Sequence, residues 1–205
     1  MAKSREKIQQ LGFWDPEVAT PDHDTICLWA HENAELIFRE AYPDLFDHSW
    51  LKEEVKVHNY EESTIALAKA FILENPRPNP RVTKRTLEFV LKTHTGYQNK
   101  MERIVGYADL LIETEVPRVY PKYKKAETWG GEYVFDGFGL GWAREPEAPL
   151  ILVEAKSVLS TVGELMRQIQ LYRTAFKGKI VVVSPDDKYA NILTEQGVTF
   201  LKYSP

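Results

Sequence analysis

Apolar residues recur with two different periods along the chain. Residues 25–41 and 61–74 place apolar side chains every three to four positions, which predicts two helices. Asp22 or Asp24 is expected to cap the first, and the proline-rich segment 75–80 ends the second. Beyond it the period shortens to two, which is typical of strands. We therefore expect a helical N-terminal part followed by a sheet.

The remaining apolar segments predict a mixed sheet. Strands are expected at 86–93, 102–116, 148–156, 178–185 and 198–203, with a turn at 93–100 and helices at 160–176 and 186–197. Ser160 or Thr161 is expected to cap the first of these helices. Three sequential strands favour an antiparallel meander, whereas the later strand–helix–strand order favours parallel additions. The expected class is α/β (mixed α+β), with helices on both faces of the sheet.

One domain is expected over residues 1–205, because this length suffices for a single core. Its helical part would span 1–80 and its sheet core 86–203. Residues 117–147, rich in proline, glycine and aromatic side chains, are interpreted as an insertion that holds short strands. Insertions of that length are often functional.

Composition excludes several protein classes. Hydrophobic residues make up 43% of the chain and charged residues 27%, which is ordinary for a globular protein. The single cysteine, Cys27, rules out an internal disulfide and a cysteine-rich zinc cluster. No apolar run approaches the roughly 18 residues of a membrane helix, and the N-terminus lacks an apolar signal core. A soluble, cytoplasmic protein is expected.

Charge is uneven along the chain. The net charge is −4, yet residues 76–125 hold 11 basic and 5 acidic residues. This region is either a solvated surface or a surface that contacts phosphates, as in nucleic-acid binding. Its basic residues are Arg77, Arg81, Lys84, Arg85, Lys92, Lys100, Arg103, Arg118, Lys122, Lys124 and Lys125, with Tyr97, Tyr120 and Tyr123 interleaved.

Charged side chains interrupt two apolar strands. Alternate residues of a strand share a face, so Glu154 and Lys156 point away from the core positions Ile151, Val153 and Ala155. Asp109 interrupts the strand at 102–116 in the same manner. If the two strands are neighbours, Asp109 and Glu154 converge. One interpretation is a buried salt bridge, because the Glu-x-Lys pattern is short.

The other interpretation is a hydrolytic site. Two carboxylates can hold Mg²⁺, which prefers oxygen ligands and activates a bound water. The Lys156 ammonium would stabilise charge that develops on a phosphate. In the next helix Glu164, Gln168 and Tyr172 follow one another at intervals of four, and this polar line either supports the site or is a solvated helix face.

The ordered pattern of Asp109, Glu154-Ala155-Lys156 and Gln168-x-x-x-Tyr172 resembles the PD-(D/E)XK nuclease superfamily. The resemblance covers residues 86–203. It implies a restriction-endonuclease-like αβββαβ core and Mg²⁺-dependent cleavage of DNA, with Mn²⁺ able to substitute. Asp109 and Glu154 would be the metal ligands and Lys156 the catalytic lysine. Gln168 and Tyr172 would align the site or contact nucleic acid.

Several alternatives stay open at the level of sequence. Asp136 precedes Glu154 by 18 positions, Asp109 by 45, so Asp136 is a rival first metal ligand. We prefer Asp109 because its strand pairs naturally with residues 86–93. Many such nucleases add an acidic residue from the first helix, and Glu32 and Glu35 are both available.

The other residues with reactive side chains are interpreted as structural. The five histidines are scattered, and Cys27 is expected to pack in a helix without a histidine partner. The alternative function is a catalytically inactive nuclease-fold domain that binds nucleic acid or serves in assembly. A homodimer would suit two-strand cleavage, and the sequence is compatible with DNA or RNA and with exo- or endonuclease action.

Overall fold

Two compact units share the chain. Unit 1 comprises residues 1–41, 82–113 and 149–205, and unit 2 comprises residues 42–81 and 114–148. The protein is represented by a computed structural model, which describes residues 21–47, 62–75, 78–95, 101–125, 133–144, 146, 148–159 and 161–204. The predicted insertion at 117–147 falls within unit 2.

Unit 1 begins with two helices, α2 (Pro21–Glu32) and α3 (Ala34–Ala41), where one helix over 25–41 was predicted. Pro21 suits the first helical turn, because its missing N–H has no partner there anyway. The expected caps Asp22 and Asp24 therefore lie inside α2 rather than before it. The two helices part at the single residue Asn33, where the backbone N–H and the side-chain amide both donate to the Trp29 carbonyl oxygen, at 2.8 and 2.9 Å.

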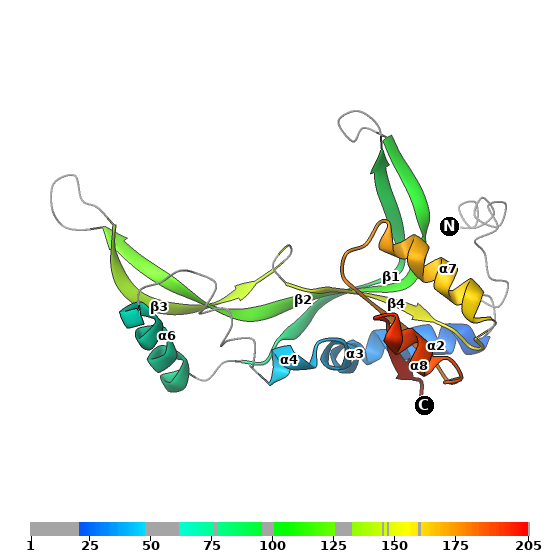
Figure 1. Ribbon diagram of the computed structural model, residues 1–205, viewed down its shortest axis with the longest axis horizontal. Helices are drawn as coiled ribbons and strands as arrows, with labels where there is room; N and C mark the ends of the chain where they lie inside the picture. Colours follow the sequence, from blue (N-terminus) through cyan, green and yellow to red (C-terminus); the bar gives the residue numbers. More distant parts are fainter. Residues whose placement is uncertain are drawn as a thin grey trace. The chain divides into compact units, whose positions relative to one another are not determined.

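The described strands form a six-stranded sheet with the order β1-β2-β4-β5-β6, and β3 pairs with β2 alone (Figure 1). Their bounds are β1 Arg81–Thr95, β2 Met101–Lys125, β3 Tyr133–Ala143, β4 Leu150–Ala155, β5 Lys179–Ser184 and β6 Thr199–Lys202. β2 pairs antiparallel with β4, and β4, β5 and β6 run parallel. The predicted mixed sheet is thereby confirmed.

β1 and β2 form the predicted hairpin, although both strands exceed their expected bounds. Lys84 near the start of β1 pairs with Glu113 at 2.6 Å, and Lys92 near its end pairs with Glu102 at 2.9 Å. The start of β1 thus lies beside a later part of β2, and the end of β1 lies beside the start of β2, so the two strands are antiparallel. Residues 96–100 of the predicted turn lie outside the described residues.

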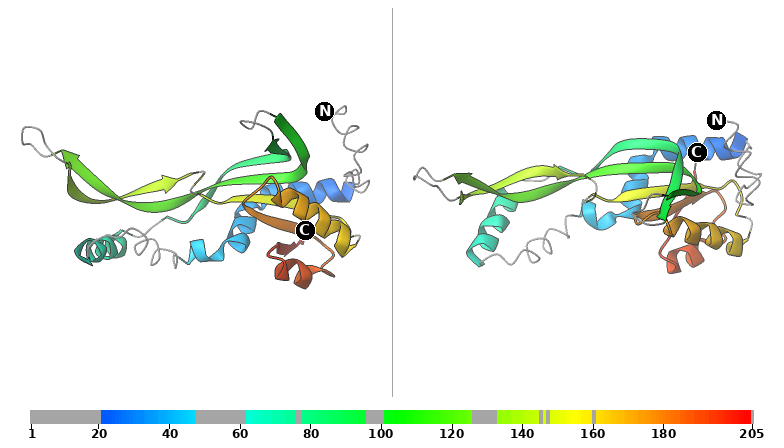
Figure 2. Two further views of the ribbon diagram at one scale, coloured as in Figure 1. Left: turned by 45° about the horizontal axis from the view of Figure 1, so that its top comes forward. Right: turned by 90° about the horizontal axis from the view of Figure 1, so that it is seen from above.

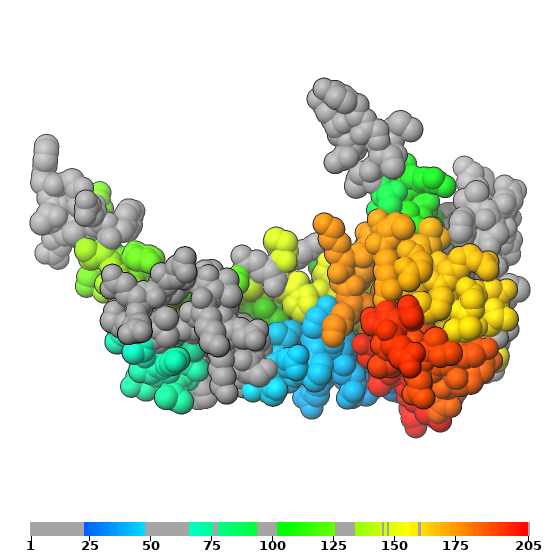
Figure 3. All heavy atoms as spheres, in the orientation of Figure 1, coloured from blue at the N-terminus to red at the C-terminus, as the bar shows by residue number. Residues whose placement is uncertain are grey.

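Helices cover both faces of the unit 1 sheet (Figure 2). On one face α2 lies against β4 and β5, and α3 lies against β5 and β6. On the other face α7 (Val162–Arg173) packs Leu165, Ile169 and Tyr172 into a core with Leu152 and Val182. Ile151, Val153 and Ala155 are fully buried, as their alternation predicted. In the space-filling view, α7 lies against the C-terminal segment on the surface of this unit (Figure 3).

Capping determines where the C-terminal helices begin. The Thr161 hydroxyl is the N-cap: it accepts from the Glu164 N–H and donates to the Glu164 carboxylate at 3.0 Å. The alternative cap, Ser160, lies outside the described residues. Helix α8 (Ala190–Glu195) is shorter than the predicted 186–197, because the Asp186 side chain accepts from the Lys188 N–H and so holds a turn there.

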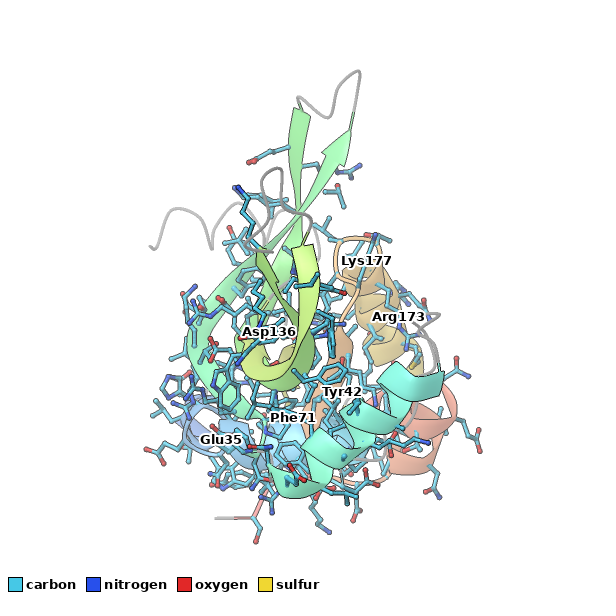
Figure 4. The ribbon with its side chains drawn as sticks, turned by 90° about the vertical axis from the view of Figure 1, so that its left-hand side faces the viewer. Glu35, Tyr42, Phe71, Asp136, Arg173 and Lys177 are labelled. Atoms are coloured by element: carbon cyan, nitrogen blue, oxygen red, sulfur yellow. The ribbon has the colours of Figure 1, made fainter. Side chains whose placement is uncertain are left out.

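Unit 2 contains α4 (Pro43–Phe46), α6 (Glu62–Glu74), β3 and the second half of β2. β2 and β3 pair from Val116–Ala143 to Lys125–Tyr133, with an irregularity between Pro121 and Tyr123. The expected short strands around Tyr133-Val134-Phe135 and the glycine-rich segment are therefore one strand. Phe71 of α6 contacts Phe138 of β3 at 6.2 Å between ring centroids; Phe71 and Asp136 are labelled in Figure 4.

A buried carboxylate organises one end of the β2–β3 ribbon. Glu115 is 1% exposed, and its Oε2 accepts two hydrogen bonds from Arg81, at 3.0 and 2.7 Å. Arg144 donates to its Oε1. The Arg81 guanidinium also lies 4.1 Å from the Trp142 ring centroid. The hydrogen bonds from Arg81 lower the pKa of Glu115, and Arg144 lowers it further. Burial acts in the other direction, but the pKa remains below its ordinary value.

We expect Glu115→Gln to destabilise unit 2 by about 2 kcal/mol, because hydrogen bonds between charged groups are lost in a buried setting. The stabilisation from Glu115 is full above pH 4.5, its ordinary pKa, and is lost as the pH falls through the lowered one. Chemical denaturation at pH 7 and at acidic pH measures both effects. The control is Glu113→Gln, whose pair with Lys84 is exposed and contributes little. Equal losses for the two variants would contradict the assignment.

In the described part of the chain, no helix has the length and apolar character needed to cross a membrane.

Candidate functional site

The candidate site lies in unit 1 where the ladder between β2 and β4 ends. The last paired residues are Leu110 and Val153. One position beyond, the Asp109 carboxylate accepts a hydrogen bond of 2.7 Å from the Ala155 backbone N–H. Asp109 is thereby held next to Glu154, as the sequence predicted for neighbouring strands. A side chain thus takes the place of a backbone acceptor at this point of the sheet.

Glu154 is 3% exposed and is held by two side chains of α7. Gln168 Nε2 donates to Glu154 Oε1 at 2.7 Å, and the Tyr172 hydroxyl lies 3.0 Å from Oε2. Gln168 Nε2 also donates to the Tyr172 oxygen at 2.7 Å. The four-residue spacing in the helix places both side chains on the carboxylate. The predicted residues Gln168 and Tyr172 therefore contact Glu154 directly.

Tyr172 ties this network to β2. Its hydroxyl donates to the Tyr107 carbonyl oxygen at 2.6 Å, two residues before Asp109. The ring passes Gly106, where an added Cβ would lie 3.1 Å from Tyr172 Cε1. A glycine at this position lets the helix approach the strand closely. One tyrosine thus fixes the positions of both strands that carry the carboxylates.

The surroundings of Glu154 favour its protonated form. Burial, followed by the negative charge of Asp109, raises the pKa of Glu154 to about 7, although Lys156 and Tyr172 act against the shift. The Tyr172 hydroxyl has a single proton for two acceptors, the Tyr107 carbonyl oxygen at 2.6 Å and Glu154 Oε2 at 3.0 Å. A protonated Glu154 can donate to the Tyr172 oxygen.

Lys156 completes the predicted group of charged residues. It is 6% exposed, and its Nζ lies 3.2 Å from Glu154 Oε1. Its backbone N–H donates to the Val183 carbonyl oxygen, which prolongs the pairing of β4 with β5. The ammonium is thus fixed by regular sheet structure at the point where the carboxylates meet.

Two residues near Asp109 were not predicted to belong to the site. His23 of α2 is 3% exposed, and its Nε2 lies 3.4 Å from Asp109 Oδ1 and 3.3 Å from Cys27 Sγ. The expectation that Cys27 lacks a histidine partner is therefore wrong. The available signal was the four-residue spacing of His23 and Cys27, which places both on one face of a helix.

The charges around this cluster shift both pKa values. Burial by itself would lower the pKa of His23, but the hydrogen bond to Asp109 and the charges of Asp109 and Glu154 raise it above its ordinary value. Burial, and then the same two carboxylates, raise the pKa of the Cys27 thiol. Cys27 is therefore a thiol until a cation displaces its proton.

The remaining predicted acidic residues make other contacts. Asp136, the rival of Asp109, belongs to unit 2 and pairs there with Lys124 at 2.8 Å. Glu35 Oε1 accepts from the Val82 N–H at 2.9 Å, and Glu32 is exposed. The Glu164 carboxylate accepts from the hydroxyl of Thr161, the N-cap of α7.

Part of the basic region is neutralised by carboxylates. Four of its described basic residues form ion pairs: Arg81 with Glu115, Lys84 with Glu113, Lys92 with Glu102 and Lys124 with Asp136. Arg77, Lys100 and Tyr97 lie outside the described residues. The other basic residues of this region are Arg85, Arg103, Arg118, Lys122 and Lys125, all at least partly exposed.

Comparisons with family models, curated proteins and solved structures find no significant match to this chain.

We expect Glu154→Gln to change how stability depends on pH in metal-free buffer. Between pH 4.5 and about 7 the folded protein retains a proton that the unfolded chain has lost, so wild-type stability falls as the pH rises through this window. Glutamine stays neutral, so the variant should lose that slope and melt at a higher temperature than wild type at pH 8. Thermal melts across the pH range measure this. The exposed control Glu195→Gln should retain the wild-type slope.

We expect Tyr172→Phe to lower the free energy of unfolding by about 1–3 kcal/mol, because the buried Tyr107 carbonyl oxygen and Glu154 Oε2 both lose a hydrogen-bond partner. Chemical denaturation gives the value. Tyr189→Phe is the matched control, since the Tyr189 ring lies beside the exposed Lys188 ammonium. If Tyr172→Phe lowers the free energy of unfolding no more than Tyr189→Phe does, the Tyr172 hydroxyl does not stabilise the site.

Proposed function

We propose that the protein is a Mg²⁺-dependent nuclease that hydrolyses phosphodiester bonds of DNA. The observation that carries the proposal is the convergence of Asp109, Glu154 and Lys156 at the end of one strand ladder, with both carboxylates held by hydrogen bonds. Burying charged groups costs folding free energy, and such groups cluster at functional sites.

The donor set fits a hard divalent cation. Asp109 and Glu154 offer carboxylate oxygens, the ligands that Mg²⁺ prefers. Their mutual repulsion contributes to the raised pKa of Glu154, and a cation between them would remove it. When bound, Mg²⁺ would polarise the scissile phosphate and activate a water.

The residues of the chain would supply positioning and charge. Asp109 and Glu154 would hold the ion. Lys156 would direct its ammonium at the phosphate oxygens, where negative charge develops. Gln168 and Tyr172 would act as positioning residues, because they fix the Glu154 carboxylate rather than reach past it.

The order of elements also supports the proposal. A helix, the hairpin β1–β2, the antiparallel neighbour β4, helix α7 and the parallel strand β5 follow one another in unit 1. This order is similar to the αβββαβ core of the PD-(D/E)XK nucleases. The acidic residues fall on the second and third strands of that order, and the glutamine and tyrosine on the next helix.

A surface of unit 2 suits nucleic acid as the partner. We call Arg118, Tyr120 and Lys122 the ribbon strip. Tyr120 pairs with Gly139 and Arg118 with Gly141 across the ribbon, and a Cβ added at either glycine would lie 2.9 Å from the Tyr120 ring. Tyr120 therefore lies across the glycines, 44% exposed and with a basic residue on each side. Aromatic rings stack on bases while nearby cations contact phosphates.

We expect Lys156→Ala to lower Mg²⁺-dependent DNA cleavage at least about 100-fold while the protein remains folded. The assay compares supercoiled, linear and single-stranded DNA with Mg²⁺, Mn²⁺ or EDTA. Lys177→Ala, an exposed lysine shortly after α7, is the control that should cleave normally. Glu154→Gln should be inactive too, since the amide is a poor ligand for Mg²⁺.

Cleavage that persists in EDTA or in Lys156→Ala would contradict the proposed site. If no substrate is cut by the folded wild type, the inactive nucleic-acid-binding or assembly module becomes the better assignment. Calorimetric titration with Mg²⁺ separates the two, because an inactive module with a degenerate site should not bind the ion.

We expect Tyr120→Ala to weaken binding of single-stranded DNA about tenfold, because one stacked base is lost. Tyr120→Phe retains the ring and should bind like wild type. Fluorescence anisotropy with a labelled oligonucleotide in EDTA measures binding without cleavage. Equal affinities of the alanine variant and wild type would exclude the ribbon strip as a contact surface.

A further inference from the structure

Three different metal-binding side chains converge beside the proposed catalytic carboxylates. His23 and Cys27 are one turn apart on α2, and Asp109 lies on β2. The His23 Nε2, Cys27 Sγ and Asp109 carboxylate oxygen all lie within 4.8 Å of one another. We call these residues the HCD cluster. Only Asp109 belongs to the catalytic group described above.

The two donor separations measured from His23 Nε2 match those around a tetrahedral ion. In a zinc site with bonds of about 2.0–2.1 Å to nitrogen or oxygen and about 2.3 Å to sulfur, tetrahedral angles separate nitrogen from sulfur by about 3.5 Å and nitrogen from oxygen by about 3.4 Å. In the HCD cluster these separations are 3.3 and 3.4 Å. The Cys27 Sγ and the Asp109 oxygen lie within 4.8 Å of one another, and a bound ion would draw them to about 3.5 Å.

The surroundings orient the ligands toward a common point. The Ala155 N–H holds Asp109 Oδ2, which leaves Oδ1 directed at His23. Hydrogen bonds to the far atom of a ligand typically fix metal sites in this way. His23 is nearly fully buried, so little of the cost of desolvating it would remain to be met on binding.

The donor atoms favour a divalent cation that is borderline between hard and soft, such as Zn²⁺. Mg²⁺ prefers oxygen ligands, whereas one nitrogen, one sulfur and one oxygen suit Zn²⁺ and its spectroscopic substitute Co²⁺. We propose that His23, Cys27 and Asp109 form a binding site for Zn²⁺ or a similar borderline divalent cation. On binding, Cys27 gives up its thiol proton and His23 the proton on Nε2, both to solvent, and the two residues coordinate as thiolate and neutral imidazole.

Such an ion would compete with the catalytic one for Asp109. The HCD cluster then serves as an inhibitory site, at which Zn²⁺ withdraws Asp109 from the carboxylate pair. Inhibition rests on the proposed nuclease function, whereas zinc binding itself does not. The two claims are therefore tested by separate measurements.

The binding test titrates untagged, metal-free full-length protein with Co²⁺. The chain has one cysteine, so a thiolate-to-cobalt charge-transfer band in the near ultraviolet must come from Cys27. We expect the band in wild type, its displacement by Zn²⁺, and its loss in Cys27→Ala and Cys27→Ser. Competition with a chromophoric chelator should show a loss of zinc affinity of at least about tenfold in these variants and in His23→Ala. His31→Ala, another histidine of α2, should bind like wild type.

The absence of the band in folded wild-type protein, or equal zinc affinity of wild type and Cys27→Ala, would overturn the site. Circular dichroism confirms that each variant is folded. For inhibition, Zn²⁺ is added to the Mg²⁺-dependent cleavage assay, where it should inhibit wild type at least tenfold more strongly than Cys27→Ala. A band without inhibition would keep the site and exclude competition for Asp109. A band without any cleavage would overturn the nuclease proposal alone.

Discussion

The structure of unit 1 depends on accommodating the buried Glu154 carboxylate beside Asp109. Two like charges in a region of low dielectric repel one another strongly, and neither can be left without hydrogen bonds. Hydrogen-bond partners meet this constraint: the Ala155 N–H of β4 for Asp109, and Gln168 and Tyr172 of α7 for Glu154. Gly106 lets the Tyr172 ring lie close to β2 in this arrangement.

A comparison of Glu154 with Glu115 shows how the partners of a buried glutamate determine its charge. Each carboxylate is almost inaccessible to solvent, yet their pKa values move in opposite directions. Glu115 receives two guanidinium groups and remains ionised, so it acts as a structural anchor of the β2–β3 ribbon. Glu154 is paired with one ammonium and faces a second carboxylate. An additional cation would stabilise Glu154 much more than Glu115, which is why we place the chemistry in unit 1.

Much of the fold could be predicted from the sequence. Short apolar segments identified β4, β5 and β6 to within two residues at each end, and the order of elements predicted which strands are parallel. The boundaries of helices were less accurate where local side-chain hydrogen bonds decide them. Asp186 delays the start of α8, because its short polar side chain accepts from the nearby Lys188 N–H.

The sequence by itself determined which residues alternate, which helix follows the Glu-x-Lys strand, and that Glu154, Lys156, Gln168 and Tyr172 are close along the chain. These features are local, because a strand has a period of two and a helix places residues four apart on one face. Only the tertiary structure brought Asp109 to the Ala155 N–H and His23 to Asp109. Those contacts join residues 46 and 86 positions apart, and they depend on how β2 leaves its ladder and how α2 packs on the sheet, which no local period encodes.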